Sequence, residues 1–108
     1  MIVVTTEEVA GHRTVEMKGQ VFGLVVRSRG LGGNIMATLR SIGGGEIVEY
    51  TQLLEDARRH AVDRMVQNAT AMGANAVIRM QYDSSEIGTT MSEIVAYGTA
   101  AIVEPLRN

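Results

Sequence analysis

The segment Glu46–Met72 constrains the fold most, because it is long and contains neither glycine nor proline. Apolar residues recur in it every three or four positions, which is typical of one face of an amphipathic helix. They are Ile47, Tyr50, Leu54, Ala57, Ala61, Met65, Ala69 and Met72. Gly73 follows, where glycine commonly ends a helix in the left-handed conformation. The pattern predicts a helix of roughly 40 Å at 1.5 Å per residue.

The rest of the chain has the patterns of strands. A β-branched run opens it, and Gly19–Gln20 interrupts the next strand as a bulge would. We expect strands at Ile2–Thr6, Arg13–Lys18, Val21–Arg27, Ala76–Asp83 and Met91–Val103, with Ser84–Thr90 as a hairpin loop. In Ala76–Asp83, the alternation places Ala76, Ile78, Met80 and Tyr82 on one face. Asn34–Ile42 has helical spacing, with Asn34 suited to the N-cap.

The fold class that follows is α+β. An antiparallel β-sheet packs against one long and one short helix, and residues 1–108 form a single domain.

The last predicted strand indicates that the chain associates with itself. Both of its faces are apolar: Ile94, Ala96, Gly98, Ala100 and Ile102 form one, and Val95, Tyr97, Ala101 and Val103 form the other. A single helix layer covers one face of a sheet, so the other needs a partner, most simply a second copy. In the alternative, the N-terminal strands fold over it. With no Trp, one Phe and seven Met, the core is also poor in large rigid side chains.

Composition excludes several classes of function. The net charge of −2 offers no basic field for nucleic acid or an anionic membrane surface. The absence of cysteine excludes disulfides, thiolate metal sites and thiol nucleophiles, and fits a reducing compartment. The N-terminus lacks the pattern of a signal peptide, and no apolar run is long enough to span a bilayer. We expect a cytoplasmic, soluble protein.

The glycine-rich stretch "RGLGGN" at residues 29–34 is better explained as a connection than as a phosphate cradle. A dinucleotide fingerprint needs glycine where Ile35 stands, and a P-loop needs a following Gly-Lys-Ser/Thr. The alternative is an anion held at the start of the short helix, with Arg27 or Arg29 nearby.

The long helix carries a candidate metal site. Asp56, His60 and Asp63 lie three and four residues apart, which puts them on one face of a helix. Carboxylates and imidazole are ligands for divalent ions, and such an ion is the one cofactor that the residues suggest. The competing interpretation is an ordinary solvated helix face.

Arg58 falls within the apolar stripe, where a charged side chain needs a partner. It is either an anion-binding residue facing a ring channel or cleft, or a structural residue at a subunit interface. In the second case its partner is Glu93 or Glu104 of a neighbouring subunit, or backbone carbonyls. With Arg40 and Tyr50, near the helix start, Arg58 forms our candidate ligand-binding or intersubunit site. No catalytic residues are identified, because the sequence shows no convergent catalytic constellation.

The segments "LRSIGGGEIVEY", "MGANAVI" and the N-terminal "MIVVTTEEVAGHRTVEMKGQVFG" resemble the YbjQ-like family, which carries a heavy-metal-binding label. The resemblance covers nearly the whole chain. It implies a dodecin-like α+β subunit and a homopentameric ring.

The leading functional prediction is a ring-forming homo-oligomer that binds a metal ion or small ligand without catalysing a reaction. One alternative is an enzyme with an intersubunit site near Arg40, Tyr50 and Arg58. Another is a purely structural or protein-interaction module.

Overall fold

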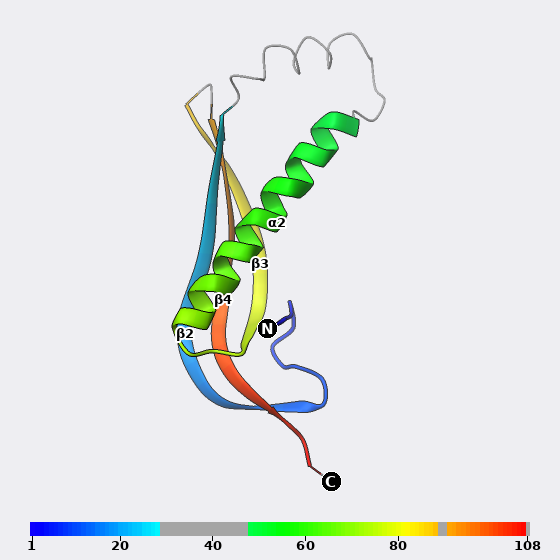
Figure 1. Ribbon diagram of the computed structural model, residues 1–108, viewed down its shortest axis with the longest axis vertical. Helices are drawn as coiled ribbons and strands as arrows, with labels where there is room; N and C mark the ends of the chain where they lie inside the picture. The colour runs from blue at the N-terminus through cyan, green and yellow to red at the C-terminus, as the bar shows by residue number, and fades with distance from the viewer. Residues whose placement is uncertain (29–47, 89–90, 108) are drawn as a thin grey trace.

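A computed structural model describes residues 1–28, 48–88 and 91–107. The predicted short helix, the "RGLGGN" stretch and Arg40 lie outside these residues. The described elements are β1 (Ile2–Val3), β2 (His12–Ser28), α2 (Val48–Ala71), β3 (Ala76–Ile87) and β4 (Met91–Pro105). Helix α2 lies within the range predicted for the long helix and crosses the sheet obliquely (Figure 1).

The four strands form one sheet in the order β1-β3-β4-β2. Strand β4 pairs antiparallel with both β2 and β3, whereas β1 pairs parallel with β3. The sheet is therefore mixed, and the prediction of an antiparallel sheet was wrong for β1. Backbone hydrogen bonds hold this edge: Ile2 donates to the carbonyl of Asn75, Val4 donates to that of Val77, and Met80 donates back to that of Val4.

Strand β2 is continuous through the predicted bulge. Its pairing with β4 shifts register between Thr14 and Glu16 and again between Met17 and Gly19. Gly19 has φ +114°, a conformation that glycine adopts without steric cost.

Two predictions for β3 were wrong. Residues 84–87, expected in a hairpin loop, continue the strand, because each pairs with a residue of β4. The predicted alternation also fails, because a bulge between Ile78 and Gln81 shifts the register, and Arg79 has φ +53°. Ile78 consequently packs on the face opposite α2, whereas Met80 packs against the helix-side core.

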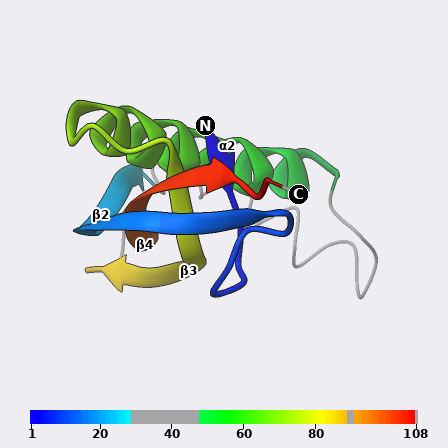
Figure 2. The same ribbon diagram turned by 90° about the horizontal axis from the view of Figure 1, so that it is seen from below.

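The main core lies between α2 and the sheet. The smallest residues of the predicted stripe, together with Met65, are buried there, against strand residues from β2, β3 and β4. The helix contributes Ala57, Ala61, Met65 and Ala69, and the strands contribute Val21, Val25, Val77, Ile94, Ala96 and Ala100. Small helix residues let the two layers approach closely, and Figure 2 shows α2 on one side of the sheet only.

The helix also covers part of the free edge of β2. Arg64 donates a hydrogen bond to the carbonyl of Leu24, and Asn68 donates to that of Phe22. Covering an edge with a helix removes acceptors that would otherwise pair with another strand.

The other side of the sheet has an uncovered apolar surface, which we call the open face. The register places Phe22 opposite Tyr97, Leu24 opposite Val95 and Val26 opposite Glu93. Its apolar members are Phe22, Leu24, Val26, Ile87, Met91, Val95 and Tyr97. All but half-buried Val95 are exposed.

The N-terminal segment covers the far end of this same side. There Val9 packs with Ala76, Ile78 and Val103 in a second, smaller core. The alternative in which N-terminal residues cover the second face therefore holds at one end only. In the described part of the chain, nothing covers Phe22 and Leu24 in the same way.

Candidate functional site

Arg58 lies on α2 beside a cavity between the helix and the strand ends. The residue is exposed, and its guanidinium carbon is 5.0 Å from the centroid of the Tyr82 ring on β3. This is within the range of a cation–π contact. Arg58 is therefore not buried within the apolar stripe, where the sequence pattern placed it. Its side chain is exposed and its guanidinium lies over the Tyr82 ring.

The cavity has a volume of about 370 Å³. Its walls come from α2, from the end of β3 that sequence patterns assigned to a loop, and from the start of β4. The lining residues are Leu54, Arg58, Ser84, Ser85, Glu86, Ser92 and Ile94. The extension of β3 therefore supplies one wall of this cavity, and Ser84, which pairs in register with buried Ile94, lies on the side of the sheet that faces the helix.

The two carboxylates predicted as intersubunit partners of Arg58 lie away from it within one chain, and the pairing between subunits stays a prediction. Glu93 pairs in register with Val26 of the open face, on the side of the sheet away from α2. Glu104 forms an ion pair with Arg13, at 2.5 Å. Neither carboxylate is the partner of Arg58 within one chain. Tyr50 lies in the first turn of α2, and Arg40 is outside the described residues.

The predicted metal ligands do not converge. Asp56 forms an ion pair with Arg59, at 3.2 Å, and His60 receives a hydrogen bond on Nδ1 from Arg27 of β2. Asp63 is exposed on the same helix. In residues 1–28, 48–88 and 91–107, no three His, Cys, Asp or Glu side chains are grouped as a metal site requires. Helical spacing placed the three predicted ligands on one face of the helix. It could not show that Arg59 pairs with Asp56 and that Arg27 donates a hydrogen bond to His60.

Arg27 is a residue that the sequence pointed to only as a neighbour of the glycine-rich stretch. Its guanidinium reaches the helix at His60, while its Nε is buried and has no hydrogen-bond partner in the described part of the chain. Arg27 pairs in register with Ser92 of β4, and Ser92 lines the cavity beside Arg58. The sequence signal that could have identified Arg27 is its position as a basic residue at the end of an apolar strand.

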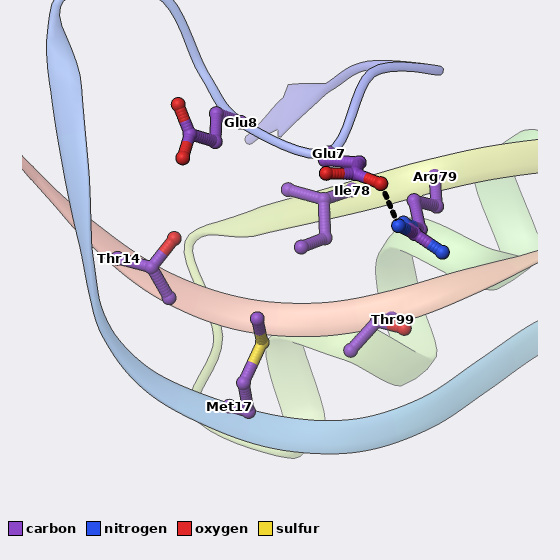
Figure 3. A pocket seen from close by; sticks show the side chains of 7 residues that line it. All are labelled: Glu7, Glu8, Thr14, Met17, Ile78, Arg79 and Thr99. Carbon is purple, nitrogen blue, oxygen red and sulfur yellow. Dashed lines mark hydrogen bonds and ion pairs between the residues drawn. The ribbon is translucent and has the colours of Figure 1, made fainter.

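A second cavity, of about 470 Å³, lies on the other side of the sheet. The N-terminal segment and all three long strands line it (Figure 3): Glu7, Glu8, Thr14, Met17, Ile78, Arg79 and Thr99. Arg79 forms an ion pair with Glu7, and its backbone N–H donates to the carbonyl of Thr6. No sequence signal marked this cavity, because it depends on the bulge at Arg79.

The chemistry of the two cavities differs. In the second, the guanidinium of Arg79 is already paired with a carboxylate, and the carboxylate of Glu8 is a further negative charge. In the first, the guanidinium of Arg58 lies over an aromatic ring and has no carboxylate partner among the described residues, although the carboxylate of Glu86 also lines the cavity. An anion is therefore better accommodated in the cavity at Arg58.

Among the described residues, no helix combines the length and apolar character needed to cross a lipid bilayer.

Comparison with known proteins identifies the family. The model of the YbjQ family, described as "Putative heavy-metal-binding", matches residues 1–104. A UPF0145 protein of Bradyrhizobium sp. is 73% identical over 107 residues, covering 99% of this chain and 96% of its own. A UPF0145 protein of Picrophilus torridus is 56% identical over 108 residues, covering 100% and 92%. The chain belongs to this family.

A solved structure supports the fold alone. The crystal structure of a protein of unknown function from Pediococcus pentosaceus superposes with a TM-score of 0.63 at 14% identity. The superposition covers 96% of this chain and 98% of the other.

Proposed function

We propose that this member of the YbjQ family is a homo-oligomeric binding protein. Its subunits associate through the open face, and its cavities hold a small ligand rather than a catalytic centre. The resemblance stated from sequence favours a closed ring of five subunits.

The observation that carries the proposal is the exposure of large apolar side chains on the open face. Phe22 is 51% exposed, Val26 46% and Leu24 37%. Contiguous exposed apolar surface of this kind is typical of interaction sites. Because buried apolar area stabilises by about 25 cal/mol per Å², covering these side chains favours association.

A second copy is the partner that best fits this surface. Residues 19–26 carry no charge, so the central part of β2 lacks the lysines that commonly protect an edge strand from aggregation. A second copy of the chain always carries the same apolar surface, so the open faces of two copies can cover each other. Since Arg64 and Asn68 occupy edge carbonyls of β2, we expect the contact to use the face of the sheet.

The cavity beside Arg58 supports the ligand-binding part of the proposal. Its volume of about 370 Å³ falls within the usual range of roughly 300–1,000 Å³ for small-molecule sites. A metal ion is the second candidate, favoured by the family's description. The described residues of one chain offer no three-ligand group, so a metal site requires ligands from a neighbouring subunit or from the rest of the chain.

The test is native mass spectrometry of untagged protein purified without chelators, with two lysine variants. Phe22→Lys places a charge on the open face. Val15→Lys is the control, since Val15 is on the same strand and is 49% exposed but lies outside the open face. We expect an oligomer for wild type and Val15→Lys, and subunits of single-chain mass for Phe22→Lys.

The mass of any compound that stays bound through purification distinguishes a binding protein from the two alternatives, a structural module and an enzyme. A fixed organic or metal mass per subunit supports a binding protein. An oligomer that retains no ligand and binds none in titrations favours a structural or protein-interaction module. Turnover of a bound compound would favour the enzyme alternative.

A further inference from the structure

We infer that the cavity at Arg58 binds the oxyanion of a small molecule, a phosphate or a carboxylate carried on an apolar body. The inference rests on the ligand-binding part of the proposed function and names the chemical class of that ligand. It does not depend on the open face.

The first step is the state of the Arg58 guanidinium. The guanidinium carbon lies over the Tyr82 ring, 5.0 Å from the centroid, which holds the group beside the cavity. Among the described residues, no carboxylate or carbonyl accepts a hydrogen bond from it. A guanidinium presents its N–H donors in a planar fork, which fits the paired oxygens of a phosphate or carboxylate.

The second step is the supply of further donors. Ser84 and Ser85 line the same cavity from β3. Within the described residues, neither side-chain hydroxyl has a hydrogen bond, although the backbone N–H of Ser84 donates to Asp83. A hydroxyl rotates to donate to whichever acceptor is present. Ser84 pairs in register with Ile94, on the side of the sheet that faces α2, whereas Ser85 pairs with Glu93, on the other side. The guanidinium and the Ser84 hydroxyl together form a donor set for an oxyanion.

The third step is the apolar part of the wall. Leu54 on α2 and buried Ile94 on β4 line the cavity next to these donors. One carboxylate, that of Glu86, also lines it, and both Glu86 and Ser92 have interactions of their own. A ligand with an anionic end and a short apolar body matches this division. A free inorganic anion would leave the apolar wall at Leu54 and Ile94 without a contact.

The test is a titration followed by two-dimensional amide NMR of the assembled protein. The probes are phenyl phosphate and benzoate, which separate the phosphate from the carboxylate source, and benzyl alcohol as the uncharged control. We expect amide shifts at Arg58 and at residues 84–86 with one or both anions. The dissociation constant for benzyl alcohol, measured from the amide shifts of the same residues, should be at least ten times larger than for the preferred anion.

Matched variants assign the effect. Arg58→Gln should weaken binding of the preferred anion at least tenfold, and Arg58→Lys by less. Arg59→Gln is the control, because Arg59 is adjacent and exposed but pairs with Glu55 and Asp56 instead. It should bind within twofold of wild type. The double variant Ser84→Ala/Ser85→Ala should weaken binding threefold or more.

The double variant keeps the inference testable if Arg58→Gln alters assembly, which native mass will show. The inference is overturned if wild type binds neither anion, or if the shifts map away from residues 58 and 84–86. It is equally overturned if the Arg58→Gln and double-serine variants bind like wild type. A monomeric wild type that binds the anion would contradict the assembly proposal and leave this inference standing.

Discussion

Gly23 of β2 and Ala61 of α2 lie backbone against backbone. A Cβ built on Gly23 would meet the carbonyl oxygen of Ala61 and the amide nitrogen of Met65 at distances that real Cβ atoms do not reach. Helix α2 therefore rests directly on the strand at this point. The alanines on its buried face permit this approach, which in turn sets the tilt of the helix across the sheet.

Gly23→Ala should therefore destabilise the fold. Since the obstruction is rigid backbone, α2 must move, and overpacking of this kind costs about 1–3 kcal/mol or more. Urea denaturation measures the loss. Gly11→Ala is the comparison, because its Cβ would meet no atom within 4 Å and only the positive φ of +72° opposes it. If the two variants lose equal stability, the close contact is not important.

Asn75→Ala should remove a link between the turn after α2 and the end of β4. The Asn75 side chain donates to the carbonyl of Val103 at 2.9 Å and accepts from its N–H at 2.8 Å. Leaving part-buried backbone groups unpaired costs about 1–3 kcal/mol. Thermal denaturation should show a clear drop for Asn75→Ala. Asn68→Ala, which loses one exposed hydrogen bond, should show a smaller one.

Arg79 offers a test of backbone strain. Its φ of +53° disfavours a residue with a side chain by about 1–2 kcal/mol, and glycine avoids that cost. Both Arg79→Gly and Arg79→Ala lose the exposed ion pair with Glu7, which contributes about 0–1 kcal/mol. We expect the glycine variant to be the more stable of the two by about 1 kcal/mol in chemical denaturation. An alanine variant of equal or greater stability would show that the bulge is unstrained.

The helix-face residues Asp56, His60 and Asp63 are expected to contribute little to any bound metal. Basic side chains engage the first two, so the triple variant Asp56→Asn/His60→Asn/Asp63→Asn should retain the metal content of wild type. Elemental analysis of protein purified without chelators measures it. Stoichiometric metal in wild type that disappears in the triple variant would restore the helix-face site.

Local sequence predicted the features that depend on one segment at a time. The alternating and helical patterns located α2 and β4, Gly73 ends the helix region with φ +84°, and Gly19 marked the bulge in β2. The spacing placed Arg58 inside the apolar stripe, which was wrong, because the structure has its side chain exposed.

Features that depend on pairing between distant segments were missed. Residues 84–87 carry turn-forming serines, yet they form a strand because β4 supplies a continuous ladder. The bulge at Arg79 and the parallel pairing of β1 arise from contacts with the N-terminal segment. Tyr82 could not be identified as the partner of Arg58 from sequence, because the bulge determines which face Tyr82 occupies.

The most direct test of the central claim is the native mass of the wild-type protein at micromolar concentration, by sedimentation equilibrium. Association through the open face predicts a stable multiple of the 11.6 kDa chain, and the ring predicts a fivefold multiple. A twofold multiple would keep the interface but replace the ring with a face-to-face pair. A mass of one chain would contradict the account, since Phe22, Leu24 and Val26 would then remain exposed in solution.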